Sequence, residues 1–444
     1  MVKWLVSLVV AIGLLFAPKT GRACADPVLY GAFPNDGFDD GYGIRQALIA
    51  EDHVCLGSGV WELEYLTGTR SVTILSGQSV SGLGASTIVR QHGDGHLGTW
   101  VAFALQGGEL RDLALYQDAW NLDPGGQTHM VQVEDSDGSR LSHLLLGPGS
   151  VGAGDCIRLL GNTNALAHLQ VTNVFTSGCY RSGISVQHGV VSATVSDSVF
   201  LATHGQGVDY EPTSAGPVLI TWTGNVMAGS GLALTMSDKG ENGSVFKGNL
   251  ILGNVQAVRA TNVLFEGNTV LGDTSYVGPT FQVVGGSTGL RLIGNYLSRP
   301  AGAPASYVVQ LMGQSSLYPS HALISGNRLV QNTQSQAIQT EGLTYALISE
   351  NDITMVAWAT GWAVSCRSIG VACDALVIAN NLVSSASTTS AAFEVAGYST
   401  NSVGRVLLLG NIATGFTYGL RCDPPWAGPI STTNNLIGAN LGGC

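Results

Sequence analysis

The stretch Gly248-Asn249-Leu250-Ile251 decides the fold, because its Gly-Asn-x-apolar pattern returns along most of the chain. Successive copies lie about 26 residues apart on average, with intervals of 19 to 32 residues. The other full copies are Gly224-Asn225-Val226-Met227, Gly267-Asn268-Thr269-Val270, Gly294-Asn295-Tyr296-Leu297 and Gly326-Asn327-Arg328-Leu329, and Asn173, Asp197, Asn351, Asn380, Asn411 and Asn434 continue the series. A repeat of this length indicates an architecture of stacked units.

A short strand with alternating apolar residues recurs in phase with this turn. Alternation with a period of two places the apolar side chains on one face of a strand and the others on the opposite face. The copies begin at Val131, Ile157, Ile184, Val208, Leu232, Val258, Phe281, Ile338, Phe393 and Leu420. Each repeat is therefore strand, turn, strand, Asn turn and strand.

The repeat predicts an all-β, single-stranded, right-handed parallel β-helix of about a dozen coils. One such repeat cannot bury its own apolar face, whereas stacked coils bury a continuous core. One Asn in every coil can bond to the coils above and below it and form a ladder. A β-propeller is the alternative, but its blades need roughly 40 residues and four strands. A short helix over residues 44–50 is expected to cap the N-terminal end.

The composition excludes several classes of protein. Only 11% of the residues are charged, 45% are hydrophobic and 60 are glycine, which is unlike a disordered chain, and no Gly-X-Y period indicates collagen. The net charge is −11, and no cluster of basic residues suits a nucleic acid. This acidic balance also disfavours a highly anionic substrate, unless a local arginine cluster overrides it.

The N-terminus predicts export. Residues 1–25 have the form of a signal peptide, with Lys3 before an apolar region over residues 5–17 and Ala23-Cys24-Ala25 as the cleavage site. The mature chain would then begin at Asp26 and be secreted or periplasmic. An uncleaved anchor helix is the alternative, and no later segment is long and apolar enough to span a membrane. Residues 26–444 are expected to form one domain, with 26–100 as cap and first coils and 101–444 as repeat coils.

Eight cysteines suit an exported protein with disulfides. Cys366 and Cys373 are close enough to staple one turn, Cys422 could tie down Cys444, and Cys156 lies about one repeat from Cys179. Cleavage after Ala25 would remove Cys24. Cys55 is then expected to be a buried free thiol, since it lies in an apolar run.

The N-terminal segment resembles the opening of the pectate-lyase-like superfamily. It has a turn at Tyr30–Asp40, a following helix, and the stretches Val54–Trp61 and Ser81–Ile88. The spacing around Asn35-Asp36-Gly37 departs from the family pattern, and Leu56-Gly57 replaces the usual Leu-Pro. With the repeat, the resemblance covers nearly the whole mature chain. It implies the β-helix fold and leaves the activity open, because the superfamily contains lyases, hydrolases, epimerases, fructan-cleaving enzymes and phage tailspikes.

A second stretch has a more specific resemblance. Arg181–Val186 and, one coil later, Thr203–Pro212 are similar to the "RQGISV … GIDIEPN" segment of a subgroup of bacterial β-helix proteins. The second part is also distantly similar to the "YGFDPH" region of mannuronan C5-epimerases, although Thr213 replaces the family's His.

Asp209 and Glu211 are the predicted catalytic pair, with His204 beside them. They lie two residues apart on one strand, so both point out of the coil. The superfamily's substrate groove lies along the outward face of this strand stack, which implies that neighbouring side chains bind substrate. Those predicted substrate-binding residues are Glu134, Arg158, Tyr180, Arg181 and Gln187. The alternative for the two carboxylates is that they are simply solvated on an exposed strand. Arg158 and Arg181 could equally be salt-bridge partners of these carboxylates. Gln339 with Glu341 is the next candidate pair.

Paired carboxylates predict an enzyme that cleaves a polysaccharide, with a glycoside hydrolase slightly favoured over a polysaccharide lyase. In hydrolysis one carboxyl group protonates the leaving oxygen while the other activates water or attacks the sugar. A lyase could instead use Arg158, Arg181 and His204, with Ca²⁺ held by Asp209 and Glu211. Otherwise no metal or cofactor is expected. A uronan C5-epimerase and a non-catalytic glycan-binding rod remain alternatives, and no oligomeric state is predicted.

Overall fold

The chain folds as a parallel β-solenoid of about 12 turns, with 60% of its residues in strands and 4% in helices. The computed structural model describes residues 24–64, 70–92, 94–96, 99–118, 120–121, 127–149, 154–161, 165–187, 189–211, 218–236, 243–314, 317–356, 362–369, 372–386, 391–397, 404–423, 430–433 and 435–437. The predicted all-β fold and its number of coils are confirmed. The chain divides into two compact units, Met1–Ile184 and Ser185–Cys444. The predicted division at residue 100 remains a prediction.

The first unit begins with two short helices that cap the first coils. They are the 3₁₀-helix η1 (Pro27–Tyr30) and the helix α2 (Gly41–Ala50), which includes the predicted helix and begins three residues earlier. The strands are β1 (His53–Cys55), β2 (Gly59–Glu64), β3 (Arg70–Leu75), β4 (Ser79–His92), β5 (Asp94–His96), β6 (Trp100–Gln106), β7 (Glu109–Gln117), β8 (Trp120–Asn121), β9 (Thr128–Glu134), β10 (Arg140–Leu146), β11 (Ile157–Leu160) and β12 (Leu169–Cys179). Strands of successive coils pair in parallel, as β6 does with β9 and β9 with β11.

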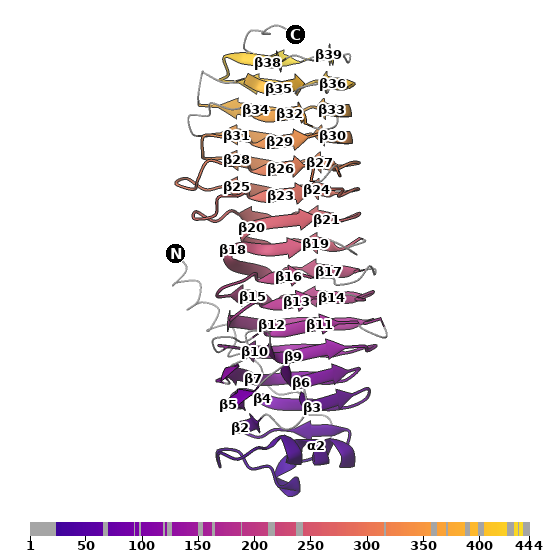
Figure 1. Ribbon diagram of the computed structural model, residues 1–444, viewed down its shortest axis with the longest axis vertical. Coiled ribbons are helices and arrows are strands. Elements are labelled where there is room, and N and C mark those ends of the chain that lie inside the picture. Colours follow the sequence, from indigo (N-terminus) through magenta and orange to yellow (C-terminus); the bar gives the residue numbers. More distant parts are fainter. Residues whose placement is uncertain are drawn as a thin grey trace. The chain divides into compact units, whose positions relative to one another are not determined.

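The second unit stacks its strands into three parallel sheets (Figure 1). We call the first the glutamine sheet; it contains β16 (Val208–Tyr210), the C-terminal parts of β18 (Val226–Met236) and β20 (Leu250–Val258), β23 (Phe281–Val284), β26 (Val309–Met312), β29 (Ile338–Glu341), β32 (Val364–Ser368), β35 (Ala391–Gly397) and β38 (Tyr418–Asp423). The strand β13 (Ile184–Val186) lies where the two units meet in sequence.

The other two sheets flank the asparagine turns. One contains β14 (Ala193–Ser196), β17 (Ile220–Thr223), β19 (Val245–Lys247), β21 (Leu264–Glu266), β24 (Arg291–Ile293), β27 (Leu323–Ser325), β30 (Thr344–Ser349), β33 (Asp374–Ala379), β36 (Val406–Leu409) and β39 (Ile430–Thr433). The other contains β15 (Val199–Ala202), the N-terminal parts of β18 and β20, β22 (Thr269–Leu271), β25 (Tyr296–Arg299), β28 (Arg328–Gln331), β31 (Asp352–Met355), β34 (Leu382–Ser385), β37 (Ile412–Thr414) and β40 (Leu436–Ile437).

The predicted asparagine ladder is present in the second unit. Asn249 shows the geometry: its Oδ1 accepts from the N–H of Asn225 at 2.9 Å and from Asn225 Nδ2 at 3.1 Å. Its own Nδ2 donates to the carbonyl of Trp222 and to Oδ1 of Asn268, so every polar atom of the buried amide is bonded. The members are Asn225, Asn249, Asn268, Asn295, Asn327, Asn351, Asn381, Asn411 and Asn435.

The prediction was wrong at three members of this series. Asn380 does not join the ladder; it occupies the preceding turn position with a φ of 55°, where other coils have glycine, and Asn381 takes the ladder position. Asn173 and Asp197 hold the same left-handed position, with φ of 53° and 51°. Asn and Asp tolerate this conformation better than other residues, which is why they can substitute for glycine there. Asn434 lies outside the described residues.

Three disulfides are described. Cys156–Cys179 and Cys366–Cys373 confirm the sequence prediction. Cys55 is bonded to Cys24 in the uncleaved chain, whereas the free thiol was expected for a chain cleaved after Ala25 and stays a prediction. The parallel bridge between Ala25 and Val54 brings the two cysteines together, and the expected cleavage after Ala25 would remove Cys24 and this bond. Cys444, the expected partner of Cys422, lies outside the described residues.

Candidate functional site

Glu134 is the centre of a buried polar network in the first unit. It is the last residue of β9, and its side chain is almost fully buried. The carboxylate accepts from Arg70 at 2.5 Å, from Gln106 Nε2 at 2.8 Å and from Gln132 Nε2 at 2.5 Å. Gln132 Oε1 also accepts from the guanidinium of Arg158 on β11 at 3.4 Å. The structure thus brings two predicted site residues, Glu134 and Arg158, together through Gln132.

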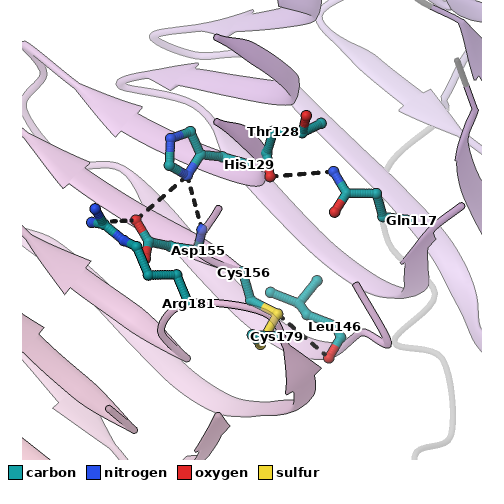
Figure 2. The surroundings of a disulfide bond; sticks show 8 residues. All are labelled: Gln117, Thr128, His129, Leu146, Asp155, Cys156, Cys179 and Arg181. Carbon is teal, nitrogen blue, oxygen red and sulfur yellow. Dashed lines mark hydrogen bonds and ion pairs between the residues drawn. A yellow bond between two sulfur atoms is a disulfide. The ribbon is translucent and has the colours of Figure 1, made fainter. Parts of the chain in front are cut away.

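Arg181 forms a two-pronged ion pair with Asp155, which Figure 2 shows beside the Cys156–Cys179 disulfide. Arg181 Nε donates to Asp155 Oδ1 at 2.9 Å and its Nη2 to Oδ2 at 3.1 Å. The Asp155 side chain is fully buried, whereas Arg181 is about a quarter exposed. Two of the three guanidinium nitrogens of Arg181 are therefore bonded to a carboxylate of the same chain. Its neighbour Tyr180 is half-buried.

His129, which the sequence analysis did not single out, lies on the other side of Asp155 (Figure 2). Its Nδ1 accepts from the backbone N–H of Asp155 at 3.1 Å, so the ring proton is on Nε2. That atom has no hydrogen-bond partner among the described residues. The pKa of His129 is lowered from 6.5 to about 4, mainly by burial; the charge of Asp155 opposes this shift, and the charges of Arg158 and Arg181 add to it. The ring fits because Gly154 has no side chain: a Cβ there would lie 2.7 Å from it.

Asp209 and Glu211 keep the predicted alternation in the second unit. The intervening Tyr210 and the preceding Val208 are completely buried in the coil, so the two carboxylates face outward. Asp209 differs from the expected exposed residue, because its exposure is only 6% and the hydroxyl of Thr235 donates to Oδ1. Glu211 is partly exposed, and its backbone N–H donates to the carbonyl of Val186 in the preceding coil at 2.7 Å.

The remaining predicted residues have different surroundings. Gln187 is buried, with an exposure of 8%, directly after Val186. His204 is exposed in the bend before β16. Glu134, Arg158, Tyr180 and Arg181 belong to the first unit, and Gln187, His204, Asp209 and Glu211 to the second. Their union into one site stays a prediction.

A row of amides runs along the outward face of the glutamine sheet. Gln256 donates to Gln282 at 2.8 Å, Gln282 to Gln310 at 3.0 Å and Gln310 to Gln339 at 2.9 Å. Gln339 then donates to a carboxylate oxygen of Glu341 at 3.2 Å. Burial raises the pKa of Glu341 above its usual 4.5, and the charge of Arg367 opposes this rise. The row therefore ends at a carboxyl group whose pKa lies above that of an exposed glutamate.

The same face continues into a second carboxylate and a tryptophan. Glu394 on β35 is buried and accepts from Ser365 Oγ at 2.5 Å and from Arg367 Nε at 3.2 Å. The guanidinium carbon of Arg367 lies 5.1 Å from the ring centre of Trp362, and that of Arg421 lies 5.5 Å from it. Glu394 and Arg421 occur in predicted strands, so alternation could have placed them outward. Trp362 precedes its strand without a repeat pattern and could not have been found in this way.

No group of three or more His, Cys, Asp or Glu side chains is arranged to hold a metal ion in the described part of the chain. Among the same residues, no helix has the length and apolar character needed to span a membrane.

Known proteins are similar to this chain in fold and not in sequence. No protein-family model and no curated protein matches the sequence. The N-terminal fragment of gene product 12 of bacteriophage phi29 has a TM-score of 0.56 at 11% identity, over 99% of this chain and 74% of its own.

Tailspike protein 3 of bacteriophage CBA120 has a TM-score of 0.52 at 14% identity, over 95% of this chain; this chain spans 64% of the tailspike, less than two thirds of its length. The catalytic unit of a GH87 α-1,3-glucanase from Streptomyces thermodiastaticus has a TM-score of 0.50 at 15% identity, over 96% of this chain and 72% of its own. With its parallel coils, its capping helix and its asparagine ladder, the chain shares the parallel β-helix fold of these solved structures.

Proposed function

We propose that the protein is an exported enzyme that cleaves glycosidic bonds in a polysaccharide, by hydrolysis rather than elimination. The observation that carries the proposal is the pair Asp209 and Glu211, two carboxylates on one strand face in unequal surroundings. Hydrolysis needs such a pair, because one group gives a proton to the leaving oxygen while the other acts on water or on the sugar. The fold adds support, since the similar GH87 structure is the catalytic unit of a glucanase. The disulfides support export.

The surroundings of Asp209 and Glu211 support different catalytic roles for the two carboxyl groups. Alternate residues of a strand lie about 6.6 Å apart, which leaves room for a sugar or a water molecule between outward carboxyl groups. Asp209 is fixed by the Thr235 hydroxyl, so we assign it the role of base or nucleophile. The more exposed Glu211 reaches the leaving oxygen as the acid. His204, in the preceding bend, and Gln187 are proposed to bind the sugar beside them.

Hydrolysis is favoured over elimination by the state of Arg181. A lyase has to neutralise the carboxylate of its substrate and remove the adjacent proton. Arg158, Arg181 and His204 were the predicted candidates for that task, but Nε and Nη2 of Arg181 donate to the buried carboxylate of Asp155. Releasing them for substrate would leave a charge buried without its partner, which is costly.

Glu341 and Glu394 form an alternative pair for the same reaction. Glu341 has a pKa raised by burial, as a general acid requires, while Glu394 accepts hydrogen bonds from Ser365 and Arg367. The two lie on the same outward face, two coils apart through β32. Gln339, which bonds to Glu341, was named with it by the sequence analysis.

A single set of amide variants tests both pairs. Turnover of neutral and uronate glycans is followed by new reducing ends and by the absorbance of unsaturated sugars. Asp209→Asn and Glu211→Gln should each slow hydrolysis by about 10²–10⁴-fold, whereas Glu341→Gln should have little effect. Glu266→Gln, an exposed carboxylate on β21 of another sheet, is the matched control.

The outcomes separate the alternatives. Reducing ends without unsaturated sugars support hydrolysis, and unsaturated products would overturn it in favour of a lyase. Loss of activity in Glu341→Gln alone would move the site to the alternative pair. Inverted uronate stereochemistry without cleavage would indicate an epimerase. No reaction on any glycan would leave a binding rod and refute the enzyme proposal.

A further inference from the structure

Two arginines on the glutamine sheet pack against one tryptophan. Arg367 is on β32 and Arg421 on β38, and the strand between them, β35, carries Glu394. Both guanidinium carbons lie within 5.5 Å of the centre of the Trp362 ring. Attraction between a cation and an aromatic face holds each guanidinium in place, so little side-chain freedom remains to be lost on binding a ligand. We call these four residues the Trp362 patch.

The patch has two guanidinium groups and one carboxylate, and Glu341, aligned with Arg367 in the strand register, is a second carboxyl group beside it, with a pKa raised by burial. Glu394 is the carboxylate of the patch, 2% exposed, and its ion pair is with Arg367. Arg421 is aligned with Glu394 in the strand register and is exposed to solvent. The chain as a whole has a net charge of −11 and only 19 basic residues, so two arginines on one ring are a local concentration of positively charged groups. An acidic protein that binds an anionic glycan needs such a concentration.

The chemistry of the patch fits a sugar that carries a carboxylate. A planar guanidinium matches a carboxylate with two parallel hydrogen bonds, which a neutral sugar cannot offer. The row of amides from Gln256 to Gln339 leads along the same sheet toward the patch and provides donors and acceptors that suit sugar hydroxyl groups.

We propose that the Trp362 patch is a subsite for a carboxylate-bearing sugar, with Arg421 and Arg367 contacting the carboxylate, so that the polysaccharide of the proposed function is an acidic glycan. This inference rests on the proposed function, and it adds the class of substrate. It gives Arg367 and Arg421 a binding role, separate from Asp209 and Glu211.

Binding is measured with a variant of strongly reduced activity, so that little substrate is turned over during the titration. Full-length Asp209→Asn is titrated with polygalacturonate, with polymannuronate and with the carboxyl-reduced form of each. Reduction converts each carboxylate to an alcohol and keeps the linkages. We expect at least one polyuronate to bind about tenfold or more tightly than its reduced form, and this preference to weaken as salt is raised.

Arg421→Gln, added to Asp209→Asn, should remove the preference for the carboxylate, while Arg421→Lys should keep part of it because charge remains without the fork. Arg405→Gln is the matched control, since Arg405 is an exposed arginine paired with Asp374 away from the glutamine sheet. Thermal melting checks the folding of each variant.

Equal binding of native and reduced glycans, or a preference that survives in Arg421→Gln, would overturn the subsite. Either result leaves the proposed function standing if the native enzyme hydrolyses a neutral glycan. A preference that depends on Arg421 in a protein with no activity would instead support the subsite and contradict the enzyme proposal.

Discussion

His129 is held neutral inside the first unit, and this makes the stability of that unit sensitive to acid. The unfolded chain takes up a proton at His129 near pH 6.5, whereas the folded protein does so only near pH 4. Between these values the unfolded state binds more protons, so the free energy of unfolding falls as the pH is lowered. Above pH 6.5 the contribution is complete. Burial of the ring is the main cause of this window, and the charged groups that face the ring, Asp155, Arg158 and Arg181, adjust it.

We therefore predict that His129→Gln reduces the acid sensitivity of the first unit. The difference between the two pKa values corresponds to about 3 kcal/mol of unfolding free energy at full protonation. Urea unfolding at pH 7 and pH 4.5, followed by amide exchange in residues 24–184, measures it. The wild type should lose more stability than the variant between these pH values. Equal losses would show that other groups cause the acid sensitivity.

At the scale of elements, each coil turns through a left-handed residue before the ladder asparagine. Glycine has no Cβ and adopts this conformation easily, as Gly326 does with a φ of 66°. Glu350 occupies the same position one coil later, with a φ of 58°, although glutamate is poorly suited to it. Its side chain is exposed, so nothing in the core requires it.

Glu350→Gly should therefore stabilise the second unit. Relief of the left-handed strain is worth about 1–2 kcal/mol, and the greater freedom of glycine in the unfolded chain cancels about 0.4–1 kcal/mol of it. A net gain of roughly 0.5–1 kcal/mol is expected in urea unfolding. Gly326→Ala, which introduces a Cβ at the matching position, should lose stability. A loss in Glu350→Gly would mean that interactions of the carboxylate outweigh the strain.

The same elements show what the sequence can and cannot predict. Alternation along a strand is local, so it correctly placed Asp209 and Glu211 outside and Val208 and Tyr210 inside. Which residues meet between coils depends on intervals that vary from coil to coil. The pairing of Arg181 with Asp155, across 26 residues, was therefore not predictable from the repeat. The near-complete burial of Asp209 also depends on neighbouring segments that the strand pattern does not describe.

At the scale of the whole molecule, the two units differ in how their disulfides constrain the unfolded chain. The first unit has two bonds that close segments of 31 and 23 residues, Cys24–Cys55 and Cys156–Cys179. In the second unit, Cys366–Cys373 closes a segment of 7 residues, and Cys422 is disulfide-bonded as well. Longer closed segments remove more entropy from the unfolded chain, so the first unit gains more from its described bonds.

Reduction of a Cys422→Ser variant, which takes the bond of Cys422 out of the comparison, should therefore destabilise the first unit more than the second. The entropy relation gives about 3–4 kcal/mol for each bond of the first unit and about 2 kcal/mol for Cys366–Cys373. Amide exchange before and after reduction, at a pH where thiols do not re-oxidise, measures this unit by unit. We expect exchange in residues 24–184 to accelerate by more than 100-fold, at least tenfold beyond the change in residues 185–437.

The variant Cys156→Ser with Cys179→Ser, left oxidised, should reproduce about half of the free-energy loss in the first unit. Only the chain-entropy argument makes the loss of stability depend on the number of residues that a disulfide encloses. Equal acceleration of exchange in both units would therefore show that these bonds act through strain or packing in the folded protein.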